Sequence, residues 1–184
     1  MTKLDLDDVR SPNTARLAIL EIVAGYGLLF DAGYGEHPDP DWAERFGRLW
    51  ARDAQFGTYP NLVVDNKIPV RGRDNIVATF QNIMRSYPHS HFVRHLSTNT
   101  VVDELDAHAG KARARSALIA AGVHDFSKLT MHRTGVYFDW FCIEDGRWCL
   151  ARRDLVYDGP KGPGAALPAG WFRNGTDKLT TSDE

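Results

Sequence analysis

The sequence predicts a single α+β domain in which three N-terminal helices pack against a strongly curved, mixed or antiparallel sheet. Two observations predict it. Apolar residues recur at helical spacing in three segments before residue 88, whereas from residue 91 four long segments alternate apolar and polar residues between short polar loops. Strands of that length must twist or bend, so we expect the sheet to wrap around the helices and leave a pocket.

The first helix is predicted over residues 14–32 and carries two neighbouring apolar stripes. One stripe is formed by Ile19, Val23, Tyr26 and Phe30, and the other by Leu17, Leu20, Ala24 and Leu28. Two stripes are typical of a helix that is covered on more than one side, so we expect both of them to be buried.

Two further helices complete the N-terminal half. One is predicted to begin after Asp39, a good N-cap, with Pro40 at the first helical position. Its buried face is expected to consist of Trp42, Phe46, Leu49 and Trp50. The other spans about residues 73–87, and its apolar stripe is Ile76, Phe80, Ile83, Met84 and Tyr87.

Two short strands are predicted between these helices, at 54–59 and 61–70, with Asp65-Asn66 as a turn. The four long strands are expected at 91–104, 111–123, 128–144 and 147–158. A two-residue loop at 145–146 would set Cys142 directly opposite Cys149. That pair is of the wider, hydrogen-bonded kind, which suits a disulfide poorly, so we expect two reduced thiols.

The length of 184 residues fits one domain, at 14–158, with an N-terminal arm (1–13) and a C-terminal tail (159–184). Trp171 and Phe172 make the tail a candidate lid over the pocket. Acidic residues outnumber basic ones by only 24 to 22, which argues against a nucleic-acid or membrane-surface partner. No apolar run reaches the roughly 18 residues of a spanning helix, and the N-terminus lacks the pattern of a secretory signal. A cytoplasmic location is therefore expected.

The stretch "HFVRHLSTN" (91–99) places polar side chains where a strand normally carries apolar ones. Three interpretations are open: an exposed sheet edge, a metal site formed with His89, or the wall of an active site. The metal site is disfavoured, since no acidic residue lies at a supporting spacing. In an active site His95 could act as a general acid or base if a carboxylate oriented it, and Asp31, at the end of the first helix, is the candidate.

The segments "YGLLFDAG", "WARDAQFGTY", "GRDNIVATF", "RHLSTN" and "TGVYFDWFCIEDGRWCLARRDLVYD" resemble, in order and spacing, the SnoaL-like superfamily. This superfamily has the cone-shaped barrel of nuclear transport factor 2, scytalone dehydratase and ketosteroid isomerase, and the resemblance covers residues 14–158. It implies that Asp31 holds one ring nitrogen of His95 and that His95 abstracts a proton. The scytalone dehydratase pattern has a tyrosine where this chain has Phe30 and a second histidine without a counterpart here, so scytalone itself is not the expected substrate.

The resemblance also implies an arginine in the site and polar groups along the pocket. Arg153 is the matching arginine, but alternation places Tyr137 on the same face as Asp139, Trp148 and Arg152 instead. Either a bulge turns Arg153 inward or Arg152 is the pocket residue, and an Asp139–Arg152 surface pair is the plainer alternative. The expected substrate-binding residues are Tyr26, Tyr59, Asn99, Tyr137 and Arg152.

These residues suggest a lyase of the dehydratase or dehydrohalogenase type that uses neither metal nor organic cofactor. Its substrate would be a hydrophobic aromatic or polycyclic small molecule, and the protein is expected to be a homo-oligomer, a dimer or a trimer. The alternatives are a non-catalytic β subunit of a ring-hydroxylating dioxygenase, a polyketide cyclase or steroid isomerase, and a binding protein without catalytic activity.

Overall fold

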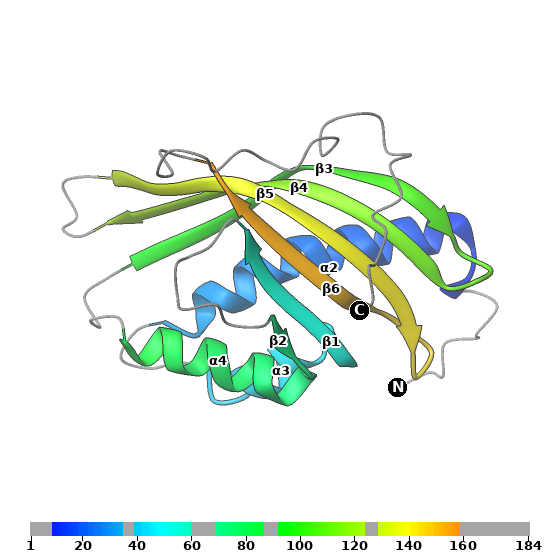
Figure 1. Cartoon of the computed structure of the whole chain (residues 1–184), viewed down its shortest axis with the longest axis horizontal. Coiled ribbons are helices and arrows are strands. Elements are labelled where there is room, and N and C mark those ends of the chain that lie inside the picture. Colours follow the sequence, from blue (N-terminus) through cyan, green and yellow to red (C-terminus); the bar gives the residue numbers. More distant parts are fainter. Residues whose placement is uncertain (1–8, 35–38, 60–68, 87–91, 124–128, 159–184) are drawn as a thin grey trace.

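The computed structural model describes residues 9–34, 39–59, 69–86, 92–123 and 129–158. Its elements, labelled as in Figure 1, are α2 (Pro12–Ala32), α3 (Trp42–Gly47), β1 (Trp50–Tyr59), β2 (Val70–Arg71), α4 (Arg73–Ser86), β3 (Phe92–Asp106), β4 (Lys111–Val123), β5 (Leu129–Glu144) and β6 (Arg147–Tyr157). The predicted C-terminal lid and the turn at Asp65-Asn66 lie outside the described residues, as does Tyr87.

The six strands form one sheet in the order β2-β1-β6-β5-β4-β3. The β1–β6 pair is parallel and the other pairs are antiparallel, which confirms an α+β fold with a mixed sheet. In the described part of the chain β2 and β3 are the two edges, so the sheet is open and not the closed barrel expected from the resemblance. Figure 1 shows α2 running along the sheet and α4 beside β1 and β2, while α3 contacts α2 and α4.

Helix α2 buries only one of its two apolar stripes. Ile19, Val23 and Tyr26 are buried against the sheet, as predicted. The second stripe is exposed, with 63% of Leu17, 40% of Leu20 and 70% of Leu28 accessible. The expectation that both stripes are buried is therefore wrong. The physical reason is that α2 packs on the sheet through one side, and no described element covers its opposite side.

The second helix is shorter than predicted. It begins at Trp42, after an Asx turn in which the Asp39 carboxylate accepts the backbone N–H of Asp41 at 2.9 Å, and it ends at Gly47. Trp50 therefore does not belong to this helix but opens β1, where it is fully buried. The remaining boundaries agree with the predicted ones within a few residues, except that the second short strand is described only as Val70–Arg71.

Tyr26 lies at the centre of the aromatic core. Its ring centroid is between 5.6 and 6.1 Å from five other aromatic rings, those of Phe30, Phe46, Trp50, Phe80 and Tyr137. Three of these contacts are edge-to-face, the arrangement that aromatic quadrupoles favour. The core thus joins all three helices to the sheet, and the side chain at its centre also faces the pocket described below.

The hairpin between β5 and β6 turns at Asp145 and Gly146, both with positive φ, of 51° and 74°. This geometry is typical of a type I′ turn, and it pairs Cys142 with Cys149 as predicted. Both are free thiols, and burial raises the pKa of each.

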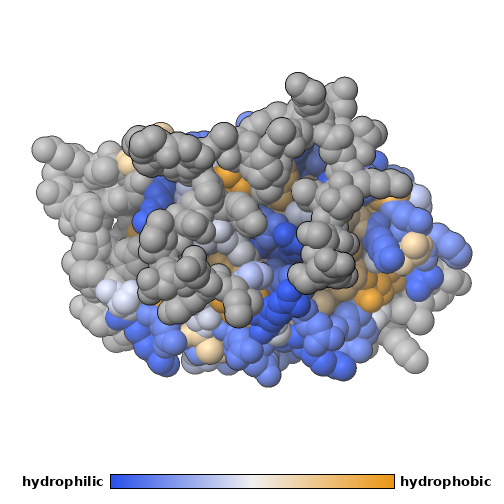
Figure 2. Space-filling view, viewed as in Figure 1, coloured by the Kyte–Doolittle hydropathy of each residue, from blue (hydrophilic) through white to orange (hydrophobic). Residues whose placement is uncertain are grey.

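Figure 2 shows that the described surface on the side facing the viewer is mainly hydrophilic, with smaller hydrophobic patches.

Glu144, at the end of β5, connects this strand to β1 and to α4. Its carboxylate accepts the backbone N–H of Arg52 in β1, with the shorter N–O distance 2.9 Å, and forms an ion pair with Arg73 at the start of α4. The hydrogen bond from the Arg52 backbone is the largest cause of the lowered Glu144 pKa; burial opposes it, and the Arg73 side chain lowers the pKa further.

Because the folded-state pKa of Glu144 is lowered, its ionised form stabilises the fold above the ordinary glutamate pKa of about 4.3, and this contribution is lost as the pH falls through the folded-state value. We expect the stability difference between wild type and Glu144→Gln to shrink between about pH 5 and pH 3. Urea unfolding across this range measures it, and a pH-independent difference would contradict the assignment.

Gly27 allows α2 to approach β3 closely. A Cβ atom at this position would lie 2.2 Å from the carbonyl oxygen of His95, far inside contact distance. The neighbouring glycine, Gly25, lies on another side of the helix, where a Cβ would meet nothing within 4 Å. The approach at Gly27 therefore fixes the spacing between α2 and the strand that carries His95.

We expect Gly27→Ala to destabilise the protein by about 1–3 kcal/mol, since α2 or β3 must shift to accommodate the methyl group. Gly25→Ala is the matched control and should be neutral or stabilising by up to about 1 kcal/mol, because alanine is the better helix former. Urea unfolding measures both variants. Equal effects of the two substitutions would mean that the approach at Gly27 is not tight.

Candidate active site

A pocket of about 590 Å³ opens between α2, α4 and the sheet. Its lining is mostly aromatic and aliphatic, and polar side chains are few. The lining residues are Tyr26, Phe30, Tyr34, Phe56, Thr58, Phe80, Ile83, Ser86, Val93, His95, Leu118, Ala120, Arg133, Tyr137, Leu155 and Tyr157. The volume and the apolar walls suit a small hydrophobic molecule.

Asp31 and His95 come together at the wall of this pocket. The distance between Asp31 Oδ1 and His95 Nδ1 is 2.8 Å, a hydrogen bond between the end of α2 and the first long strand. Both carboxylate oxygens also lie 3.1 Å from the backbone nitrogen of His95, which donates to them. The side chain of Asp31 is 3% exposed and that of His95 12%, so the pair is shielded while the imidazole still reaches the pocket.

The surroundings of the pair hold the imidazole in place. Phe30 stacks on the His95 ring with centroids 4.3 Å apart and an interplanar angle of 21°. Arg94 Nη1 lies 3.8 Å from the second Asp31 oxygen, on the solvent side. The carboxylate thus has partners at both oxygens, and the imidazole is fixed by one hydrogen bond and one stacked ring.

A buried arginine lies beneath the tyrosines of the pocket. Arg153 is fully buried and forms a bidentate pair with Asp139, with both N–O distances 2.7 Å. Its guanidinium carbon lies 4.0 Å from the ring centroid of Tyr26 and 4.3 Å from that of Tyr137. Burial alone would lower the pKa of Arg153, but the Asp139 carboxylate raises it, so the guanidinium stays charged.

The two tyrosines are held as neutral phenols. Burial raises the pKa of Tyr26 well above its ordinary value, with a smaller contribution from Tyr137. Burial likewise raises the pKa of Tyr137, although the nearby Arg153 cation opposes the shift. A side-chain hydrogen bond links Tyr137 to Tyr26. Both rings line the pocket, so the site offers phenolic hydroxyl groups and no buried phenolate.

A β-bulge decides which of the two adjacent arginines faces inward. Trp140 pairs with Arg152 and Phe141 with Leu150, so Ala151 is the extra residue. The bulge reverses the alternation beyond it and pairs Arg153 with Asp139. Arg152 instead forms an ion pair with Asp154 and lies over the Trp140 ring, 4.7 Å from its centroid. The surface pair between Asp139 and Arg152 is therefore not formed.

The structure brings some of the predicted site residues to the pocket and not others. Tyr26, Tyr137 and His95 line it, whereas Arg153 lies behind the two tyrosines and Arg152 is outside. Asn99 is exposed, with a φ of 52°, at an irregularity in the pairing of β3 with β4, and it does not line the pocket. Tyr59 ends β1, and its side chain lies outside the described part of the structure.

Sequence reasoning missed five polar residues among the described lining of the pocket, namely Tyr34, Thr58, Ser86, Arg133 and Tyr157. Arg133 shares a strand face with Tyr137, four residues on, so alternation could have found it. Tyr34 follows Asp31 by three residues, near the end of α2, but no local pattern marked it. The register between β4 and β5 shifts at Arg133, since Ala120 pairs with Arg133 but Ala121 pairs with Met131.

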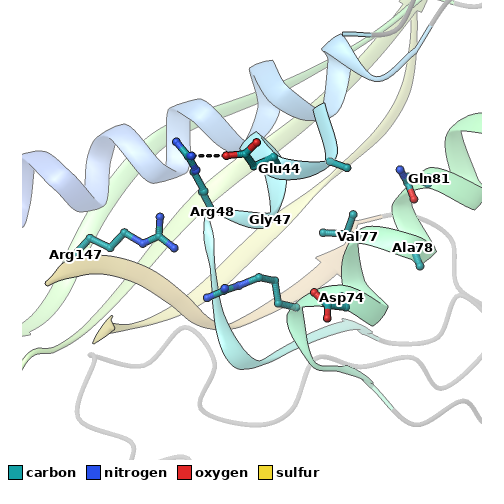
Figure 3. Close-up of a pocket in the computed structure, with 10 residues that line it drawn as sticks. Glu44, Gly47, Arg48, Asp74, Val77, Ala78, Gln81 and Arg147 are labelled. Atoms are coloured by element: carbon teal, nitrogen blue, oxygen red, sulfur yellow. Dashed lines mark hydrogen bonds and ion pairs between the residues drawn. The ribbon is translucent and has the colours of Figure 1, made fainter. Parts of the chain in front are cut away.

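A second hollow lies between α3, α4 and the start of β6, and Figure 3 shows its lining side chains. It has a volume of about 480 Å³ and contains Arg48, Arg73 and Arg147. Arg48 pairs with Glu44 and Arg73 with Glu144, so carboxylates compensate two of these three cations. No histidine or aromatic side chain lines this hollow, and the first pocket is therefore the candidate active site.

No group of three or more potential metal ligands occurs among the described residues, which do not include His89 and His91. Within the same ranges, no helix combines the length and the apolar character needed to cross a membrane.

Three solved structures from Novosphingobium aromaticivorans share this fold. The β subunit of a proposed aromatic-ring-hydroxylating dioxygenase is 21% identical, over 81% of this chain and 92% of that chain, with a TM-score of 0.59. A proposed scytalone dehydratase is also 21% identical, over 86% of this chain and 95% of that chain, with a TM-score of 0.60. A nuclear transport factor 2-like protein with a cystatin-like fold is 21% identical, over 80% of this chain and 85% of that chain, with a TM-score of 0.60.

These matches identify the architecture as the nuclear transport factor 2-like, or cystatin-like, fold. The model of the SnoaL-like domain family matches residues 13–154, and the chain belongs to this family. The resemblance inferred from the sequence motifs is thereby confirmed. Comparison with curated protein sequences gives no significant match.

Removing one partner of the buried pair beneath the tyrosines should be strongly destabilising, whereas removing both should cost less. We expect Arg153→Met to lower the free energy of unfolding by about 3–5 kcal/mol, because it leaves the Asp139 carboxylate buried without a partner. The double variant Asp139→Leu/Arg153→Met should recover part of this loss. Urea unfolding of the wild type, the single variants Asp139→Leu and Arg153→Met, and the double variant measures the coupling.

Arg152→Met is the matched control, one residue away. Its side chain is 38% exposed, so its ion pair with Asp154 is expected to contribute at most about 1 kcal/mol. If Arg152→Met cost as much as Arg153→Met, the distinction that the bulge makes between the two arginines would be contradicted.

Proposed function

We propose that the protein is a cofactor-independent lyase, of the dehydratase or dehydrohalogenase type, that acts on a hydrophobic aromatic or polycyclic small molecule. One observation carries the proposal: the 2.8 Å hydrogen bond between Asp31 and His95 Nδ1, with the imidazole on the wall of a mainly apolar pocket. A carboxylate-oriented imidazole is a common general base.

The hydrogen bond determines which ring nitrogen reacts. In neutral His95, Nδ1 carries the proton and donates a hydrogen bond to Asp31. The lone pair on Nε2 is therefore available as the base. When Nε2 takes a proton, the adjacent Asp31 carboxylate stabilises the imidazolium. The hydrogen bonds from the backbone N–H of His95 keep the carboxylate in position during this change.

The elimination can be written with this chain's own groups. His95 Nε2 removes a proton from the carbon beside a carbonyl group, and the electron pair moves onto the carbonyl oxygen. Tyr26 or Tyr137 donates a hydrogen bond to that oxyanion, since both phenols are neutral. The oxyanion then collapses, a carbon–carbon double bond forms, and the β-substituent leaves. A departing hydroxyl takes the proton from the imidazolium and becomes water, whereas a halide leaves as an anion.

Arg153 acts in this proposal as a positioning residue and not as a group that contacts the substrate. Its cation lies against both tyrosine rings and opposes part of the pKa increase that burial causes in Tyr137. A phenol with a less elevated pKa is the stronger hydrogen-bond donor toward a developing oxyanion. Asp139 keeps the guanidinium in place and compensates its charge.

A second candidate function is a non-catalytic β subunit of a ring-hydroxylating dioxygenase. The observation that favours it is the exposed stripe of Leu17, Leu20 and Leu28 on α2, a surface suited to contact with another chain. A homo-oligomer, dimer or trimer, would use the same feature. A purified protein that turns over a substrate without a second subunit argues for the lyase.

We expect His95→Ala to lower kcat by at least about 100-fold while the protein stays folded, because general-base catalysis typically contributes that much. Wild type and variant are incubated with a panel of bicyclic β-hydroxyketones and β-halogenated analogues. Mass spectrometry follows the loss of water, and an ion-selective electrode follows halide release.

Tyr137→Phe should lower kcat with a smaller effect on KM, since the hydroxyl group acts on the transition state. Undiminished turnover by His95→Ala would overturn the proposed base. If wild type exchanges the α-proton with D2O but eliminates nothing, an isomerase or cyclase is favoured over the lyase.

A further inference from the structure

We propose that the pocket accepts ligands that carry an anionic group, a carboxylate or an ionised phenol, and that Arg133 binds this group at the rim. The inference rests on the proposed function, because it names the class of molecule that the same pocket takes. It concerns binding alone, so it can be tested without turnover.

Arg133 is placed to face the pocket. It lies on β5 opposite Ala120 of β4, and both residues line the cavity. The guanidinium carbon lies 5.0 Å from the ring centroid of Tyr157 on β6, which also lines the pocket. A ring contact of this kind covers one face of the planar guanidinium and leaves its N–H edge available to donate hydrogen bonds.

The charges around the pocket favour an anion. Of the sixteen described residues that line it, none is an aspartate or glutamate, and Arg133 is the one with a permanent positive charge. Within the described ranges no carboxylate forms an ion pair with Arg133. Two acidic groups behind the wall have cationic partners of their own: Asp31 lies beside His95 and Arg94, and Asp139 pairs with Arg153. A guanidinium without a carboxylate partner, beside apolar walls, is a favourable site for a carboxylate.

The polarity of the wall sets the orientation of the ligand. The buried part of the lining consists of aromatic and aliphatic side chains, among them Phe30, Phe80, Leu118 and Leu155. Arg133 is exposed and Tyr157 half-buried, so the cation belongs to the rim. An aromatic body would enter first and its anionic group would stay at the rim, where water and the guanidinium both solvate it.

The test compares two bicyclic probes that differ in charge, 2-naphthoate and 2-naphthylmethanol, by isothermal titration calorimetry at about pH 8, where naphthoate is ionised. We expect wild type to bind the carboxylate about 1.5- to 5-fold more tightly than the alcohol, the range of a partly exposed charge pair. The preference should fall with added salt.

Arg133→Gln should remove the preference while leaving the affinity for the alcohol within about twofold, and Arg133→Lys should retain part of it. Arg113→Gln is the matched control: this arginine on β4 also lies over an aromatic ring, 5.8 Å from the centroid of Trp140, but does not line the pocket. It should keep the full preference.

Equal affinity of wild type for the two probes, an undiminished preference in Arg133→Gln, or failure of both probes to bind the folded protein would each overturn the inference. A carboxylate preference that depends on Arg133 in a protein without lyase activity would support the inference and contradict the proposed reaction. The two proposals can therefore fail separately.

Discussion

The close packing of α2 against β3 is the constraint on which the site depends. The absence of a side chain at Gly27 lets the helix backbone approach the carbonyl of His95. One helical turn further on, Asp31 then meets both the imidazole and the backbone N–H of the same residue. Gly27 and Asp31 are four residues apart and so lie on one face of α2. The close approach at Gly27 therefore also brings the Asp31 carboxylate to His95.

The second organising feature is a charge held inside the core. Arg153 has no contact with solvent, and its compensation comes from one carboxylate and two aromatic faces. The two tyrosines separate this cation from the pocket, so it contacts their rings and not the cavity. Because Asp139 compensates its charge, the pair lies behind a mainly apolar and phenolic wall without adding a net charge to it.

Much of this arrangement could be predicted from the sequence. Helical periodicity and strand alternation report local burial, so they predict the helices and the long strands, but they left open whether His95 faces solvent or a pocket. The partnership of Asp31 with His95 joins residues 64 apart in the chain; residue chemistry made Asp31 a candidate, and the family resemblance supplied the pairing. The Asp145-Gly146 turn determined the register of the last hairpin, and with it the pairing of the two cysteines.

Other features depend on information that no local pattern contains. The stripe of Leu17, Leu20 and Leu28 is as apolar as its buried neighbour, and which stripe is covered depends on how many elements surround α2. The openness of the sheet depends on whether its edge strands meet. The bulge at Ala151 leaves no mark in composition, because alanine fits either face of a strand, so alternation alone placed Arg152 beside Tyr137.

That bulge has a consequence for comparing relatives of this chain. Arg152 and Arg153 are adjacent in the sequence, yet Arg153 is buried in the core and Arg152 lies over the Trp140 ring. The extra residue of the bulge causes this difference. An alignment of this chain that ignores the bulge would match its outer arginine, Arg152, to a core position. The last strand of this chain is therefore best aligned forwards from the hairpin and backwards from its C-terminal end, with the gap assigned to the bulge.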